Sequence, residues 1–265
     1  SVTAVSGGSY DAATGEVTLD QIRAIEHSPD SGPDQEASLA AADQIRLIGT
    51  IVDDDGDSSS AVLNLGNAIS FKDDAPSITG AAASVGTLRV DESALGSNDT
   101  DDFSGLFSGN FGADGAGDID YGLSVSATGA DSGLRDSATG QDILLYMQGG
   151  DVVGRVGGAG GAIAFRVSVD GSGDVTLDQQ RAILHEPNAG PDQTAFLAAA
   201  ELIKLTATIT DKDGDSDSAT INLGNAISFR DDGPSTGSNS VVRLDDDALA
   251  NGIPGGPGGS DDANA

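Results

Sequence analysis

An internal repeat is the feature that most constrains the fold. Residues 17–77 align without a gap onto residues 175–235, at a constant offset of 158 residues. Roughly two thirds of the aligned positions are identical. A second, shorter match relates residues 88–95 (LRVDESAL) to residues 242–249 (VRLDDDAL). A repeat of this kind predicts tandem units of similar fold.

The offset also predicts where the units begin and end. We expect one complete repeat at residues 76–235. Residues 1–75 then correspond to the C-terminal part of a preceding repeat, and residues 236–265 to the start of a following repeat with a linker rich in Gly and Pro. We interpret the chain as a window from a longer array.

Hydrophobic periodicity predicts β-structure. Ile203, Leu205, Ala207 and Ile209 alternate with polar residues, as expected for a half-buried strand. Trp is absent and aromatic residues make up 4% of the chain, so the core must be aliphatic. Two short helical pieces are expected, at residues 177–185 and 194–202. The predicted fold class is all-β, with tandem Ig-like or cadherin-like β-sandwich repeats and short helical insertions.

Charge and residue usage limit the partners. The formal net charge is −31 and the isoelectric point is about 4.1, so nucleic acid and anionic membranes are poor partners and cations are good ones. An acidic surface that only aids solubility is the alternative explanation. The chain has no Cys for disulfides or thiolate metal sites. No apolar run approaches the length of a membrane span, and the first residues lack the features of a signal peptide.

An acidic turn in each repeat is the sharpest candidate site. It reads TIVDDDGDS at residues 50–58 and TITDKDGDS at residues 208–216. Carboxylates at alternate positions around a glycine suit Ca²⁺, which requires several oxygen ligands, and the glycine permits the tight turn. The pattern is not an EF-hand, because Asn64 and Asn222 stand where a glutamate is required. A polar hairpin turn without metal is the alternative. The candidate ligands are Asp53, Asp55, Asp57, Asp211, Asp213 and Asp215.

A second set of acidic residues lies at the expected junctions between repeats. One group precedes the proline that ends a repeat, and another begins the next repeat. Carboxylates from the two sides can share a cation and stiffen the junction, whereas without it they repel one another. A solvated linker is the alternative. The residues are Asp73, Asp74, Asp231 and Asp232 on one side, and Asp91, Glu92 and Asp245 on the other; Asp114, Asp118 and Asp120 form a further, weaker candidate.

Catalysis is not expected. His27 and His185 occupy the same repeat position, but no second His, Cys or nucleophile accompanies either in the sequence. We therefore expect hydrogen-bonded structural histidines rather than a metal ligand or a catalytic base. The carboxylates lie in turns of a repeated unit, and the chain has no Trp and few Tyr to stack on a sugar, so a glycosidase pair is not expected either.

An ordered set of motifs resembles the long acidic repeats of giant bacterial adhesins of the broad RTX group, which are exported by type I secretion. The motifs are VDESAL at 90–95, FGADG at 111–115, YGLSV at 121–125, VTLDQ at 175–179 and DKDGDS at 211–216. The resemblance implies a tandem β-sandwich extender region, Ca²⁺ binding, an extracellular or cell-surface location and a secretion signal beyond this window. It also implies that other domains carry adhesion to a host or abiotic surface.

The predicted function is therefore that of a non-enzymatic, Ca²⁺-stabilised spacer of a cell-surface adhesin in adhesion and biofilm formation. Its expected partners are calcium ions and neighbouring repeats of the same chain. The alternative is a recognition module that binds carbohydrate or a partner protein through loops of the complete repeat. A secreted hydrolase is a third hypothesis, which requires a measurable turnover.

Overall fold

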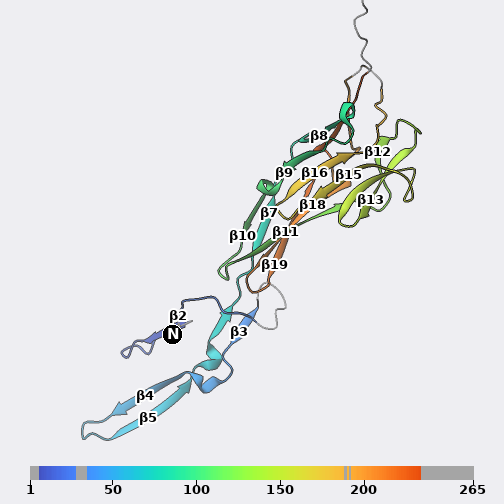
Figure 1. The fold of residues 1–265 in the computed structure, drawn as a ribbon. Helices are drawn as coiled ribbons and strands as arrows, with labels where there is room; N and C mark the ends of the chain where they lie inside the picture. The colour runs from blue at the N-terminus through green and yellow to red at the C-terminus, as the bar shows by residue number, and fades with distance from the viewer. Residues whose placement is uncertain (1–5, 28–34, 188–189, 191, 234–265) are drawn as a thin grey trace, which may run out of the picture. The chain divides into compact units, whose positions relative to one another are not determined.

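The structure is a computed structural model that describes residues 6–27, 35–187, 190 and 192–233. It is built from β-strands, and its helical segments are 3-10 turns of three residues each. The predicted all-β class is thus confirmed (Figure 1). Within the described ranges, no helix has the length and apolar character needed to cross a membrane.

Residues 6–75 form three separate pairs of antiparallel strands. The pairs are β1 with β2, β3 with β6, and β4 with β5. Their bounds are β1 Ser6–Tyr10, β2 Val17–Gln21, β3 Glu36–Ser38, β4 Arg46–Val52, β5 Ser58–Asn64 and β6 Ser70–Lys72, with 3-10 turns η1 Ala42–Gln44 and η2 Gly66–Ala68.

Residues 77–230 contain the remaining strands, and we refer to them as the complete repeat, after the repeat expected from the sequence at residues 76–235. The strands are β7 Ser77–Gly80, β8 Leu88–Asp91, β9 Asp99–Asp102, β10 Phe107–Asn110, β11 Ala116–Val125, β12 Ala130–Arg135, β13 Asp142–Gln148, β14 Asp151–Val156, β15 Ile163–Val169, β16 Asp174–Gln179, β17 Thr194–Phe196, β18 Ile203–Asp211, β19 Ser216–Asn222 and β20 Ile227–Arg230. The 3-10 turns are η3 Glu92–Ala94, η4 Ser104–Leu106 and η5 Ala200–Leu202.

The complete repeat is a sandwich around one main core. Its largest sheet has six antiparallel strands in the order β12-β13-β14-β15-β16-β9. Three-stranded sheets with the orders β11-β18-β19 and β17-β20-β8 contribute to the same apolar core, where Ile143 and Leu177 share a cluster with Leu205 and Phe229 (Figure 1). Strand β18 alternates between buried and half-buried residues along its whole length, as its period-two pattern predicts.

One parallel pairing joins the start of the complete repeat to its end. Strands β8 and β20 pair in parallel, with Val90 opposite Phe229 and Asp91 opposite Arg230. The residues that follow each strand, Glu92 and Asp231, are therefore brought to the same end of the sheet. This pairing positions one of the candidate sites described below.

The two copies of the repeat share their strand register. Leu47 lies opposite Leu63 in the β4–β5 hairpin, and their counterparts Leu205 and Ile221 lie opposite each other in the β18–β19 hairpin. The pairing of β3 with β6 likewise matches that of β17 with β20, residue for residue at the 158-residue offset. The sequence repeat is therefore a structural repeat at the level of hairpins.

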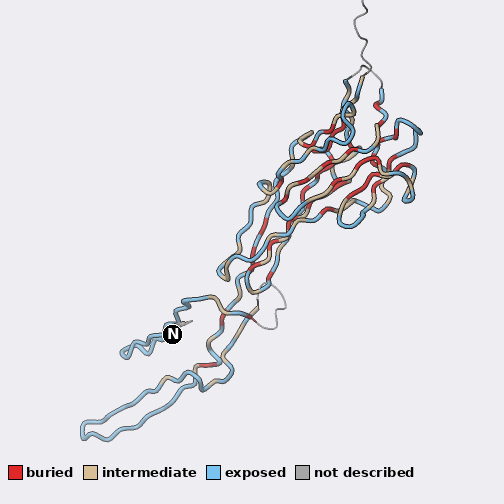
Figure 2. Tube along the Cα trace, in the orientation of Figure 1, coloured by how far each residue is buried: buried red, intermediate tan, exposed pale blue. Residues whose placement is uncertain are grey.

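Burial differs sharply between the copies. Ile51 in β4 is 76% exposed, whereas its counterpart Ile209 in β18 is 0% exposed. Leu19 is exposed while its counterpart Leu177 is fully buried. Figure 2 shows the same contrast between strands β4 and β5 and the strands of the complete repeat. In the complete repeat, Ile119 and Tyr121 of β11 pack against the cluster that contains Ile209, and Leu177 shares the main core with Leu145 and Val152. Strands β11 to β14 have no counterpart among residues 6–75, whereas β1 pairs with β2 as β15 pairs with β16.

The two helices expected at residues 177–185 and 194–202 are wrong. Leu177 lies in β16, where it pairs with Val167 of β15 and Asp99 of β9. Residues 194–196 form β17, and only Ala200–Leu202 form a 3-10 turn. The segment at 174–179 alternates between half-buried and buried residues, and its place between two strands of the largest sheet decides its conformation.

Candidate metal sites

The acidic turn of the complete repeat closes the hairpin between β18 and β19. The backbone N–H of Asp211 donates to the carbonyl oxygen of Asp215 at 3.0 Å. Oδ1 of Asp211 accepts hydrogen bonds from the N–H groups of Gly214 at 3.1 Å and Asp215 at 2.9 Å. Gly214 has a φ of 115°, which L-residues rarely adopt. Oδ1 of Asp211 therefore stabilises the turn, and Oδ2 remains available as a ligand.

Asp114 joins the turn from a different loop. The carboxylate oxygens of Asp114, Asp211 and Asp213 lie within 4.8 Å of one another. Asp211 and Asp215 are buried, and Oδ2 of Asp211 and Oδ1 of Asp213 are buried without a hydrogen-bond partner. Such oxygens carry a desolvation cost that a bound cation would offset.

Backbone contacts hold the Asp114 loop against the turn. The N–H of Lys212 donates to the carbonyl oxygen of Gly115 at 3.2 Å. Gly117 lies so close to β18 that a Cβ there would be 2.3 Å from the carbonyl oxygen of Thr210. The register of β11 on β18 shifts between Ala116 and Asp118, as at a β-bulge. Asp118 and Asp120 are exposed in β11 and are not among the clustered carboxylates, so only Asp114 of that candidate joins the turn.

Mutual repulsion and burial perturb this cluster when it holds no cation. Burial, together with Asp211, Asp114 and Asp73, raises the pKa of Asp213 from 3.8 to about 6. Burial, with Asp73 and Asp211, also raises the pKa of Asp114. A divalent cation among these oxygens would favour the ionised carboxylates and reverse both shifts.

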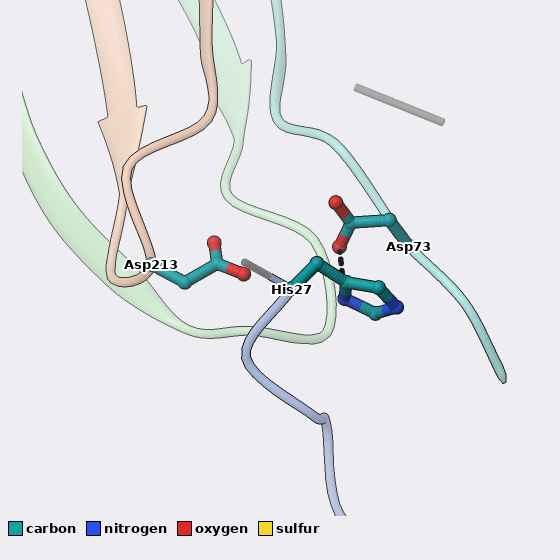
Figure 3. Close-up of side chains that lie close together, drawn as sticks. All are labelled: His27, Asp73 and Asp213. Carbon is teal, nitrogen blue, oxygen red and sulfur yellow. Dashed lines mark ion pairs between the residues drawn. The ribbon is translucent and has the colours of Figure 1, made fainter. Parts of the chain in front are cut away.

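The end of the first copy contacts the same region. Oδ2 of Asp74 accepts a hydrogen bond from the N–H of Ala113 at 2.8 Å. Asp73 groups with His27 and Asp213, with ligand atoms within 4.8 Å of one another (Figure 3). The side chain of Asp73 is 1% exposed, and its Oδ2 has no hydrogen-bond partner. Carboxylates from both copies thus converge near the acidic turn of the complete repeat.

The acidic turn of the first copy has the same backbone but a different environment. Asp53 N–H donates to the carbonyl oxygen of Asp57 at 3.0 Å, and Oδ1 of Asp53 accepts from the N–H of Asp57 at 2.8 Å. Gly56 has a φ of 96°. Asp53, Asp55 and Asp57 bring their oxygens within 4.8 Å, but all three are exposed. The local sequence therefore builds the turn in both copies, and the neighbouring loop decides whether it is buried.

The remaining junction residues are arranged differently from the sequence prediction. Asp91 accepts hydrogen bonds from the backbone and hydroxyl groups of Ser93, which lower its pKa, and lies 4.0 Å from Arg230. Glu92 groups with Asp231 and His185 of its own repeat rather than with Asp73 or Asp74. Asp232 is exposed, and Asp245 lies outside the described residues.

Both histidines are buried at equivalent positions. Nε2 of His27 lies 3.2 Å from the carbonyl oxygen of Phe71, and Nε2 of His185 lies 3.2 Å from that of Phe229. These contacts agree with the expected hydrogen-bonded role. The proximity of each Nδ1 to carboxylates was not anticipated from sequence, although the shared repeat position of the two histidines was the available signal.

These observations define an all-β protein whose complete repeat is a sandwich carrying clustered, partly buried carboxylates. The chain belongs to a family described as a domain of unknown function, DUF5801, whose model matches residues 4–66 and 87–224. No curated protein and no solved structure matched the chain.

Proposed function

We propose that the chain is a Ca²⁺-stabilised spacer segment of a bacterial cell-surface adhesin. The observation that carries the proposal is the cluster of Asp114, Asp211 and Asp213, which offers several oxygens within 4.8 Å, two of them buried without hydrogen-bond partners. Oxygen-only ligand sets of high negative charge suit hard cations such as Ca²⁺.

The proposed mechanism is electrostatic and mechanical. Asp73, at the end of one copy, lies close enough to Asp213 of the next to raise its pKa, and Asp74 accepts a hydrogen bond from Ala113. A cation at this point would bind carboxylates of both copies, close the turn and limit bending between them. Without the cation, the same charges repel one another and the connection loosens.

The adhesin assignment rests on the sequence motifs and on composition. A net charge of −31 spread over β-sandwich repeats suits a chain that meets millimolar Ca²⁺ outside the cell. In cytosol poor in Ca²⁺ the same chain would be less stable, which is compatible with export in an unfolded state.

The test is a thermal melt of the 265-residue chain in EDTA and in millimolar Ca²⁺, with Mg²⁺ and matched ionic strength as controls. The proposal predicts a large rise in melting temperature that is specific to Ca²⁺, since a ligand that binds only the folded state stabilises it by mass action. Equal melting temperatures in Ca²⁺ and in matched salt would reduce the carboxylates to a solvated surface.

A further inference from the structure

One ring nitrogen of His185 faces two carboxylates and makes no hydrogen bond. Its side chain is 4% exposed, and its Nδ1 lies 3.5 Å from Oδ1 of Asp231 and 4.0 Å from Oε1 of Glu92. Neither contact has hydrogen-bond geometry, and Nδ1 is buried without a partner. The three ligand atoms lie within 4.8 Å of one another.

The other ring nitrogen fixes the tautomer. Nε2 of His185 lies 3.2 Å from the carbonyl oxygen of Phe229, which can only accept a hydrogen bond, so Nε2 carries a proton. In the neutral ring, Nδ1 is then a bare lone pair directed at two acidic groups. This arrangement is unfavourable unless a proton or a metal cation lies between the nitrogen and the carboxylates. A backbone carbonyl that holds one N–H while the other nitrogen is free is the usual support for a metal-binding histidine.

Hydrogen bonds from neighbouring groups also hold the carboxylate of Glu92 in place. Its Oε1 accepts hydrogen bonds from Nε2 of Gln179 at 3.0 Å and from the N–H of Ile183 at 2.7 Å. Its side chain is 8% exposed, and burial is the main cause that raises its pKa. The parallel pairing of β8 with β20 brings Glu92 to Asp231. The carboxylates are therefore positioned by the fold and by neighbouring donors.

The histidine and aspartate recur in the first copy. Nε2 of His27 lies 3.2 Å from the carbonyl oxygen of Phe71, and Nδ1 lies 3.2 Å from Oδ1 of Asp73 without a hydrogen bond. The third ligand in this group is the carboxylate of Asp213, which approaches from the acidic hairpin (Figure 3). The same pair of histidine and aspartate thus forms twice, with a different second acid each time.

We propose that Glu92, His185 and Asp231 form a binding site for a divalent transition metal of the Zn²⁺ class. Imidazole nitrogen suits Zn²⁺ and its neighbours in the first transition row, whereas Ca²⁺ prefers oxygen ligands. Metal–ligand bonds of about 2.0–2.2 Å in a tetrahedron place ligand atoms roughly 3.4 Å apart. Nδ1 of His185 lies 3.5 Å from Asp231 and 4.0 Å from Glu92. Asp231 is partly exposed, which leaves an approach for water as a fourth ligand. The site shares no residue with the Asp114, Asp211 and Asp213 cluster.

The test is ¹⁵N NMR of the histidine rings in the 265-residue chain, with saturating Ca²⁺ present throughout so that the acidic turns stay loaded. The chain has 2 histidines, and His27→Gln assigns the remaining signals to His185. Addition of Zn²⁺ should shift the Nδ1 resonance of His185 to the metal-bound range while Nε2 keeps its proton. Addition of further Ca²⁺ should leave it unchanged.

Ligand variants make the test quantitative. Glu92→Gln and Asp231→Asn should each weaken Zn²⁺ binding at least tenfold, by calorimetry. Asp232→Asn changes the adjacent exposed carboxylate and should leave the affinity unaltered. The proposal is overturned if Zn²⁺ binds without moving Nδ1 of His185, or if both ring nitrogens stay protonated at saturating Zn²⁺. The NMR result on the His27→Gln chain decides the matter even where a ligand variant fails to fold.

Discussion

Asp73 and Asp213 belong to one cluster of ionisable groups, although they come from different copies of the repeat. With Nδ1 of His27, their carboxylate oxygens lie within 4.8 Å of one another. Asp73 is also among the groups that raise the pKa of Asp213 and of Asp114. The end of one copy and the acidic turn of the next are therefore coupled electrostatically, and any cation bound at this turn also acts on the connection.

The buried turn should respond to Ca²⁺ more strongly than the exposed one. Asp213→Asn should reduce the Ca²⁺-dependent rise in melting temperature, because the carboxylate of Asp213 lies in one cluster with those of Asp114 and Asp211. Its counterpart Asp55 is exposed, so Asp55→Asn serves as the matched control with a small effect. Differential scanning calorimetry in EDTA and in Ca²⁺ measures both. Equal losses in the two variants would contradict a special role for the buried cluster.

The pH dependence in EDTA should carry the signature of Asp213. Its pKa is raised from 3.8 to about 6 in the folded state, so the folded chain binds this proton more tightly than the unfolded chain does. The resulting stabilisation is present below pH 3.8 and is lost as the pH rises through about 6. Asp213→Asn should therefore melt higher than the unaltered chain at pH 7 in EDTA, and lower in Ca²⁺.

A pH-independent difference between the two chains in EDTA, measured by melts from pH 4 to pH 7 at constant ionic strength, would show that Asp213 is not buried among other carboxylates. If Asp213→Asn did not melt lower than the unaltered chain in Ca²⁺, Asp213 would not contribute to cation binding.

The ion pair between the buried Asp136 and the partly exposed Arg181 should stabilise the complete repeat. Asp136 accepts hydrogen bonds from Arg181 at 2.7 and 3.0 Å and from the hydroxyl of Thr139, and the bond from Arg181 is the main cause that lowers its pKa. Because the folded pKa is lowered, this stability is present above the unfolded pKa of 3.8 and is lost as the pH falls through the folded value.

Asp136→Asn should cost about 1.5–3 kcal/mol of unfolding free energy near pH 7, because the hydrogen bonds from Arg181 and Thr139 lose a charged acceptor. The exposed pair of Arg135 and Asp142 offers the control, and Asp142→Asn should change the stability by less than about 1 kcal/mol. Urea unfolding in saturating Ca²⁺ measures both. A cost below that of the control would remove Asp136 from the list of stabilising contacts.

The two copies should differ in how they tolerate truncation of equivalent core positions. Ile209 is fully buried, so Ile209→Ala should cost about 2–5 kcal/mol. Ile51 is its counterpart and is 76% exposed, so Ile51→Ala should stay within about 0.5 kcal/mol. Amide hydrogen exchange should accordingly protect β18 far more than β4. Equal protection of the two strands would contradict the observed difference in burial.

The sequence repeat predicted the β-class and the hairpins, because period-two alternation such as that of Ile203 to Ile209 is a local property. It did not predict the parallel pairing of β8 with β20, since a pairing between strands at opposite ends of a repeat leaves no local signal. The helices expected at residues 177–185 and 194–202 failed because sheet pairing overrides weak local propensity.

The candidate sites also combine features that the local sequence predicts with features that depend on tertiary packing. The acidic turns were predictable, because Asp and Gly spacing sets their backbone. The proximity of Asp73 to Asp213 was not predictable, because it depends on which loop packs against the β18–β19 hairpin. Asp114 was the weaker sequence candidate, yet it lies in the buried cluster. The histidines were expected to be structural, and only the direction of Nδ1 toward carboxylates indicates a further role.

The most direct test of the spacer account is the distance distribution between spin labels placed on the two copies. The chain has no Cys, so Ser70→Cys in β6 and Ala138→Cys in an exposed turn of the complete repeat introduce the only labelling sites. Double electron–electron resonance should give a narrow distribution in Ca²⁺ and a broad one in EDTA, because the cation would restrain the connection. Asp73→Asn combined with Asp213→Asn should broaden the distribution in Ca²⁺. Identical distributions in Ca²⁺ and EDTA would contradict the account.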